Sequence, residues 1–284
     1  EIRYCRALGR VVTVASGEKT HIGTTSDVTE EMYAKNFIEE RNRELESNNK
    51  ELTAFNYIAS HDLQEPLRKI ETFLSRLVNK DYDNLSKSGQ QYVSSIQSSA
   101  KRMRLLIEDL LQFSRTNKAE KVFEEANLNC LLDNAKQELA QVIEEKNGII
   151  ESNTLPTLRV IPFQIQQLFI NLISNSLKYS KQDVAPVIKI NSSLISAQES
   201  NFLPNNNNAK YYKITVEDNG IGFEQEYAKK IFILFNRLHN KNEYAGTGIG
   251  LAICKKIVEN HKGFIVANSE RNEGATFTIY ISAE

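Results

Sequence analysis

Residues 162–179 read PFQIQQLFINLISNSLKY, and they predict an amphipathic α-helix. Its apolar residues recur at helical spacing and form one buried face: Ile165, Leu168, Phe169, Leu172, Ile173 and Leu177. Asn171, Asn175 and Lys178 follow at i, i+4 and i+7 and make a polar row beside that face. Asn is a poor residue inside a helix. The row therefore indicates either a solvated face or a site where amide oxygens meet Mg²⁺ and Lys meets a phosphate.

Helices and strands alternate around this helix. We expect further helices over about 127–145, 224–232 and 247–260, and strands near 148–151, 187–195, 211–218, 263–269 and 274–282. Pro204 and Asn205–Asn208 indicate a surface loop between two of the strands. The pattern predicts an α+β sandwich, with helices on one sheet, over residues 118–284.

The segment Asp218-Asn219-Gly220-Ile221-Gly222 closes the expected strand 211–218. A carboxylate at a strand end can accept a hydrogen bond from an exocyclic amine, and the glycines permit positive φ or close approach of a ligand. A simple Asn-Gly turn accounts for the same residues when they are taken alone.

The segment Gly246-Thr247-Gly248-Ile249-Gly250 opens the expected helix 247–260. A glycine-rich approach to a helix N-terminus offers free N–H groups to a phosphate. The spacing alone is weak, because it does not follow a strand as a dinucleotide-binding loop does. Residues 236–246 before it are polar and end in glycine, which is typical of a mobile lid.

Two long helices are expected before this sandwich. The second helix runs over about 88–114, and residues 79–84 are expected to form the loop before it. The first helix carries an apolar stripe at helical spacing: Phe55, Ala59, Pro66, Ile70, Phe73 and Leu77. A hairpin of two helices with one-sided apolar faces exposes much of its apolar surface. We therefore expect two copies to form a dimeric four-helix bundle, with this domain over residues 55–117.

His61 and Asp62 lie in the first of these helices, and helical geometry places His61 on the side away from the apolar stripe. Asp62 can accept a hydrogen bond from one ring nitrogen and leave the other as a nucleophile. Taken alone, the pair favours an exposed His beside a chance Asp, because single His-Asp pairs are common. Pro66 removes a helical hydrogen bond and is expected to bend the helix.

The N-terminal segments are a linker and a β-rich remnant. Ile38, Leu45, Leu52 and Ala59 recur every seven residues, which predicts a coiled coil over 30–54 with a half-polar second seam. Residues 1–29 are expected to hold three short strands, with turns at Leu8-Gly9-Arg10 and Ser16–Lys19. Three strands cannot close a core, so we interpret them as the tail of a larger domain.

Composition limits the classes of function. The 284 residues carry 35 basic and 36 acidic side chains, and a net charge of −1 argues against a nucleic-acid-binding surface. No apolar run has the length that a bilayer requires, and three cysteines fit a reducing, cytoplasmic compartment without disulfides. The first residue is Glu1, so we expect a fragment whose missing N-terminal part could have carried a sensor or a membrane anchor.

The order of the motifs resembles that of sensor histidine kinases of two-component systems. Ser60–Leu67 is similar to the H box of the dimerisation and phosphotransfer domain, and four segments are similar to the boxes of the Bergerat-type (GHKL) ATP-binding domain: Asn171–Tyr179 (N), Asp218–Gly222 (G1), Ile231–Phe235 (F) and Gly246–Leu251 (G2). Ile22–Glu30 resembles the exit of a PAS sensor domain. Five boxes in this order cover roughly residues 51–284.

The resemblance implies the role of each residue. His61 would take the γ-phosphoryl group of ATP, Asp62 would orient its ring, and Asn175 would bind Mg²⁺. The remaining nucleotide contacts that it implies are Asp218 for the adenine amine, Lys178, Tyr179 and Arg237 around the phosphates, and Asn171, Gly220, Gly222, Gly246, Thr247, Gly248, Gly250 and Leu251 around the nucleotide. The implied partners are a second copy of the chain, an upstream sensor domain and the receiver domain of a response regulator.

Two positions, Glu65 and Ser176, depart from what is common in the family, and Asn171 distinguishes the chain from related ATPases of the same fold. Glu65 stands where many carry Thr or Asn, which puts phosphatase activity in doubt. Asn171 replaces the Glu of related ATPases and cannot act as a general base, which favours transfer to His61 over hydrolysis. Ser176 replaces a commoner Ala, and we expect little effect. A nucleotide-binding phosphorelay scaffold without autokinase activity is the alternative function.

Overall fold

The computed structural model describes residues 3–13, 17, 19–118, 122–200, 202–203, 209–238 and 246–283. The chain divides into two compact units, Glu1–Phe55 and Asn56–Glu284, and helix α1 (Thr29–Asp81) contributes to both. Within the described residues, none of the helices combines the length and apolar composition of a membrane span. The predicted loop at 204–208 and most of the predicted lid at 236–246 lie outside the described residues.

The N-terminal unit begins with two antiparallel strands, β1 (Cys5–Thr13) and β2 (Lys19–Asp27). The prediction of a turn at Leu8–Arg10 is wrong, because β1 runs through it without a break. Gly9 lies opposite Gly23, and a Cβ on Gly23 would stand 2.9 Å from the carbonyl oxygen of Leu8. The glycine pair therefore serves close approach of two strands, and the pairing continues without a break as far as Thr13 and Lys19.

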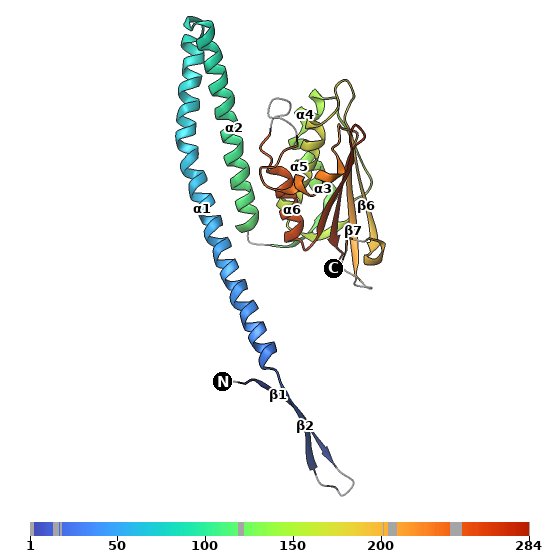
Figure 1. The fold of residues 1–284 in the computed structure, drawn as a ribbon. Coiled ribbons are helices and arrows are strands. Elements are labelled where there is room, and N and C mark those ends of the chain that lie inside the picture. The colour runs from blue at the N-terminus through green and yellow to red at the C-terminus, as the bar shows by residue number, and fades with distance from the viewer. Residues whose placement is uncertain are drawn as a thin grey trace. The chain divides into compact units, whose positions relative to one another are not determined.

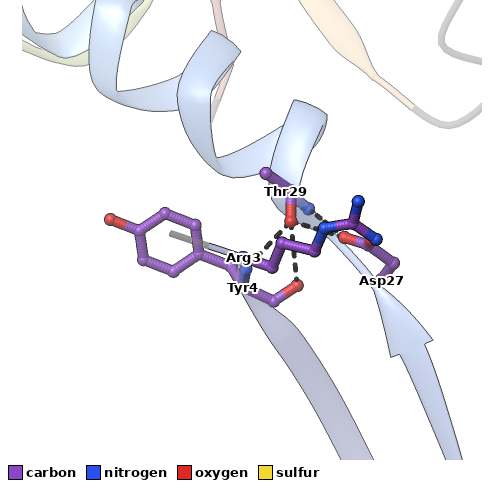
Figure 2. A network of polar contacts seen from close by, with 4 residues as sticks. All are labelled: Arg3, Tyr4, Asp27 and Thr29. Carbon is purple, nitrogen blue, oxygen red and sulfur yellow. Dashed lines mark hydrogen bonds and ion pairs between the residues drawn. The ribbon is translucent and has the colours of Figure 1, made fainter. Parts of the chain in front are cut away.

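A polar network starts helix α1 at Thr29 (Figure 2). The Thr29 backbone N–H and hydroxyl both donate to Asp27 Oδ1, at 2.9 and 2.5 Å, and the Tyr4 N–H donates to Thr29 Oγ1 at 2.9 Å. Bonds from the hydroxyl and amide of Thr29 hold the pKa of Asp27 below its ordinary value. The strand pair is thereby fastened to the first turn of the helix, since Asp27 satisfies the free N–H of Thr29. Ile38 and Leu45 are exposed in the single chain, and the coiled coil stays a prediction.

The helical hairpin is confirmed. The second half of α1 packs against α2 (Lys87–Lys118), with a 3₁₀ turn at Tyr82–Asn84 between them. The buried contacts come from Leu67, Leu74, Val93, Ala100 and Ile107. The predicted stripe was displaced by one position, since Ile70 and Phe73 remain 43% and 65% exposed. The hairpin thus buries one apolar face between its two helices and leaves a second apolar face exposed to solvent in the single chain.

The α+β sandwich is confirmed (Figure 1). One sheet has the order β4 (Ile149–Ser152), β6 (Val187–Ser196), β7 (Lys210–Asp218), β9 (Gly274–Ser282) and β8 (Phe264–Glu270). Helices α3 (Leu128–Glu138), α5 (Pro162–Lys178) and α6 (Gly250–Asn260) cover one face of it, as Figure 1 shows. All six apolar residues predicted for the buried face of α5 belong to the core between the helices and this sheet.

Several predicted elements of this domain were wrong in detail. The expected helix 127–145 breaks at Leu139 into α3 and α4 (Ala140–Glu145), and a small antiparallel pair, β3 (Glu124–Asn127) with β5 (Thr157–Val160), was not foreseen. The expected helix 224–232 is instead two 3₁₀ turns, Gln225–Tyr227 and Lys230–Phe232. A tertiary contact accounts for this difference. The Gln225 side-chain amide donates to Ala267 O (3.1 Å) and accepts from Ser269 N (2.9 Å), both in the backbone of β8.

Buried polar side chains join the C-terminal end of α6 to its surroundings. His261 Nε2 accepts a hydrogen bond from Ile161 N at 2.9 Å, so its Nδ1 donates to Ile257 O at 2.8 Å. Asn260 donates to the Thr116 carbonyl oxygen at 3.0 Å and to Gln164 Oε1 at 3.2 Å. His261 is thus a buried cross-link between the start of α5 and the end of α6.

Candidate functional site

A cavity of about 300 Å³ lies among α5, the end of β7 and the glycine-rich segment before α6. It brings together most of the predicted site residues: Asn171, Asn175, Lys178, Tyr179, Asp218, Gly222, Arg237, Gly246, Thr247, Gly248, Gly250 and Leu251. Gly220 stands beside this lining rather than in it, and His61 and Asp62 lie on α1. The side chain of His61 is outside the described part of the chain, so its predicted direction stays a prediction.

Helix α5 presents its polar row to the cavity. Asn171 is engaged structurally, because its amide donates to Gly250 O at 3.3 Å and accepts from Gln167 at 3.0 Å. Lys178 Nζ donates to the Tyr179 hydroxyl at 2.9 Å and lies 4.4 Å from the centre of that ring. The ammonium group is therefore held at the cavity wall, where it would meet an anion.

Asp218 is the most tightly fixed carboxylate of the cavity. Its Oδ1 accepts from the N–H of Gly220 (2.9 Å) and of Ala275 (3.3 Å), and its Oδ2 accepts from the Ser176 hydroxyl (2.9 Å). Burial raises the pKa of this carboxyl above its ordinary value, and the hydrogen bonds oppose that rise. Ser176 thus orients Asp218, a role that the sequence analysis missed by treating this position as neutral.

The glycines around Asp218 serve the packing of the chain's own backbone. Gly222 has φ +58°, and a Cβ there would stand 2.1 Å from Glu270 O. A Cβ added to Gly220 would likewise stand 2.6 Å from Tyr179 O. These spacings leave no room for a side chain even without a ligand. Neither reading of the Asp218–Gly222 segment included this packing of backbone against backbone, and the role of its glycines toward a ligand stays a prediction.

Gly274 offers a test of how strongly this packing supports the site. It has φ +102°, and a Cβ would lie 1.9 Å from Asp218 O. Gly274→Ala should therefore destabilise the domain by about 3 kcal/mol and lower its thermal midpoint by about 10 °C. Gly250→Ala is the matched control, because its Cβ would meet nothing nearer than Asn171 Cγ at 3.9 Å. Equal midpoints for the two variants in thermal melts would contradict this account.

The segment Gly246–Gly250 is fixed in a non-helical form, and the prediction that a helix begins at residue 247 is wrong. Gly246 and Gly248 have φ of +152° and +79°, which an α-helix excludes, and α6 begins at Gly250. Arg237 Nη1 donates to Gly246 O at 2.9 Å, and the Phe235 N–H donates to Gly248 O at 3.0 Å. The segment therefore stands as a shaped wall of the cavity.

The helical hairpin contributes a lining residue that was not predicted. Asp109 of α2 lines the cavity and accepts a hydrogen bond from the hydroxyl of Thr247. Burial raises the pKa of Asp109, while the bond from Thr247 lowers it. An Asp in the middle of a long polar helix carries no signal of this kind in sequence, because the partner is 138 residues away.

The described residues contain no group of three or more His, Cys, Asp or Glu side chains that could hold a metal ion. A cation in this cavity would instead take amide and phosphate oxygens as ligands. Asn175 fits that role, since it lines the cavity and its amide makes no hydrogen bond to any residue that the structure describes.

Two family models match the chain. The family described as histidine kinase-, DNA gyrase B- and HSP90-like ATPase matches residues 161–284, and the His Kinase A (phospho-acceptor) domain matches residues 51–118. Together they take in the hairpin that carries His61 and the sandwich that carries the cavity.

Similar proteins extend the comparison. Cyanobacterial phytochrome A of Nostoc sp. is 36% identical over 234 residues, which cover 82% of this chain and 29% of the phytochrome. The phytochrome-like protein Cph1 of Synechocystis sp. is 35% identical over 235 residues, which cover 83% of this chain and 30% of Cph1. The chain therefore spans less than a third of the length of these relatives.

Solved structures share the fold. Full-length ShkA in complex with AMPPNP superposes with a TM-score of 0.59 at 21% identity, covering 81% of this chain and 46% of ShkA. The histidine kinase AdeS of Acinetobacter baumannii superposes with a TM-score of 0.52 at 19% identity, covering 79% of this chain and 98% of AdeS. At these identities the likeness concerns the fold alone.

Proposed function

This chain belongs to the histidine kinase family, and from that premise we propose that it is an ATP-dependent sensor histidine kinase. In this proposal His61 is autophosphorylated and then passes its phosphoryl group to an Asp of a response regulator. The observation that carries the proposal is the cavity, whose lining combines the fixed carboxylate of Asp218 with the cationic side chains of Lys178 and Arg237. A carboxylate for a base and cations for phosphates are what a nucleotide requires.

Asp218 is the proposed adenine contact. Its Oδ1 and Oδ2 already accept three hydrogen bonds from Gly220, Ala275 and Ser176, so the carboxylate cannot rotate freely. An ionised carboxylate has about four lone-pair sites, and one remains for the exocyclic amine of adenine. The carboxylate is therefore pre-oriented, and little ordering entropy is lost when a base enters.

The phosphates are assigned to the part of the cavity where the cationic side chains lie. Lys178, Tyr179 and Arg237 surround this end, and Gly246 lies against Lys178, since a Cβ there would stand 2.4 Å from its Nζ. Mg²⁺, when bound, neutralises phosphate charge and orients the reacting group, and Asn175 is the residue proposed to ligate it. Asn171 makes no such contact in our proposal, because its amide is committed to Gly250 and Gln167.

The chemical step depends mainly on how the γ-phosphate of ATP is positioned relative to the imidazole of His61. A neutral imidazole nitrogen of His61 attacks the γ-phosphorus, an N–P bond forms, and the bond between that phosphorus and the bridging oxygen breaks to release ADP. Asp62 accepts a hydrogen bond from the other ring nitrogen and stabilises the positive charge on the ring, and it takes up the proton afterwards. Asn171 lacks a basic group, so activation of water in competition with His61 is not supported.

The partners follow from the open surfaces and the length of the relatives. Ile70, Phe73, Ile96 and Met103 stay exposed on the hairpin of the single chain, which supports a homodimeric four-helix bundle. We assign the residues before α1 to the end of a PAS-type sensor domain.

Glu65 forms an ion pair with Lys69 at 3.0 Å rather than offering a neutral hydroxyl or amide, and we propose weak phosphatase activity.

The test is to incubate the chain with Mg²⁺ and ATP labelled in the γ-phosphate. Label that is stable in alkali and labile in acid, as an N–P bond is, and that maps to the peptide with His61 is the expected result. ATP binding without any incorporated label would favour a phosphorelay scaffold that lacks autokinase activity. Steady release of phosphate without labelled protein would contradict the proposal and indicate an ATPase of the same fold.

A further inference from the structure

One face of α2 is docked on the sandwich that holds the cavity. Leu106, Asp109, Phe113 and Thr116 follow at intervals of three, four and three residues, so they lie on one side of the helix. Leu106 and Phe113 pack against the buried core of the sandwich, and α2 runs along α6. We call these four residues the docking face of α2.

Two polar contacts hold the docking face, one at each end of α6. At the C-terminal end, the carbonyl oxygen of Thr116 accepts from Asn260, and the Asn260 and Gln164 side chains there are only 8% and 1% exposed. At the N-terminal end, Asp109 accepts from Thr247 in the glycine-rich segment. The first contact is buried, polar and neutral, whereas the second places an acidic group in the cavity.

The position of Asp109 conflicts with the ligand proposed for this cavity. Its carboxylate lines the same space as Lys178, Arg237 and Gly246, which we assign to the phosphates. A triphosphate carries several negative charges, and a like charge within a few ångströms in a partly dry site is strongly unfavourable. The Thr247 hydroxyl and the Ile249 N–H are also committed to the present arrangement, since Thr247 Oγ1 accepts from Ile249 N at 3.4 Å while donating to Asp109.

We propose that Asp109 couples nucleotide binding to the release of α2. Without nucleotide, its carboxylate holds Thr247 and keeps the docking face in place. The phosphates of ATP displace that carboxylate, and the sandwich separates from α2 and becomes free to carry the γ-phosphoryl group to a histidine. This inference rests on the proposed nucleotide site and adds to it the residue that makes docking and binding exclude each other.

The coupling has a thermodynamic consequence. If docking lowers the affinity for nucleotide by some factor, nucleotide must weaken docking by the same factor. The contact at Thr116 is expected to act as the hinge, because it joins backbone and neutral amides that a nucleotide at the other end of α6 does not approach.

The first experiment measures the affinity of the whole chain for AMPPNP with Mg²⁺ by titration calorimetry. Asp109→Asn keeps an acceptor for Thr247 but removes the charge, and it should bind about tenfold more tightly than the wild type. Glu108→Gln is the matched control, since Glu108 is the neighbouring carboxylate but points outward and pairs with Arg104 at 3.9 Å. Its affinity should stay within about twofold of the wild type.

The second experiment reports docking itself. The chain contains no tryptophan, so Phe113→Trp introduces a single tryptophan on the docking face, which can be excited selectively in the presence of the 11 tyrosines. Saturating AMPPNP should shift its emission to the red as the ring leaves the sandwich. Equal affinities for the wild type and Asp109→Asn, or an emission unchanged by bound AMPPNP, would overturn the coupling. Failure of the nucleotide site itself would look different, with no variant binding AMPPNP at all.

Discussion

His61→Gln is expected to incorporate no label from γ-labelled ATP, a loss of at least about a thousandfold. Gln has no ring nitrogen with a free lone pair, so no N–P bond can form at this position. The variant should still bind AMPPNP as the wild type does, because the cavity is lined by Asp109 and by residues between Asn171 and Phe277.

The control for this variant is His21→Gln, which changes a histidine of strand β2 in the other unit. It should keep both labelling and nucleotide binding. Labelling of the His61 variant at the level of the wild type would refute the phosphorylation site. If the His61 variant lost AMPPNP binding as well as labelling, the substitution would be acting through the fold instead.

Asp218→Asn is expected to weaken AMPPNP binding by about a hundredfold without weakening the domain. The lost affinity is that of a hydrogen bond to a charged acceptor, and the new NH₂ group would face the adenine amine. The other contacts can persist, since an Asn oxygen accepts from Gly220 and Ala275, and its NH₂ group can donate to the Ser176 hydroxyl. Glu217→Gln, at the exposed neighbouring position, should change neither quantity.

The effect of Asp218 on stability has a defined sign. Burial raises its pKa in the folded state, so ionisation costs folding free energy. That cost is absent below about pH 4, where the carboxyl is protonated in both states, and is fully present above the raised pKa. Asp218→Asn should therefore melt at the same or a higher temperature than the wild type at pH 7, with the difference vanishing towards pH 4. A variant less stable than the wild type at pH 7 would contradict this assignment.

The residues of this site can be identified from short stretches of sequence, but the contacts that assemble the site join residues far apart in the sequence. The polar row of α5 and the carboxylate at the end of β7 could be identified because helical and strand periods place them on known faces. The 3₁₀ turns at 225–232 could not, because their local sequence has a helical pattern and the Gln225 side chain holds them to β8 instead. Likewise, β3 has the sequence EEAN, which favours no strand until β5 pairs with it.

Local chemistry was sufficient for the two-helix hairpin, for the amphipathic helix α5 and for the candidate ligands along it, since each depends on residues within a few turns of one another. It was not sufficient for the neighbours that orient those ligands. The bond from Ser176 to Asp218 and the contact between Asp109 and Thr247 join residues 42 and 138 positions apart. Contacts of that separation exist only after the core has packed, because packing alone brings the two side chains within bonding distance and removes the water that would otherwise satisfy them.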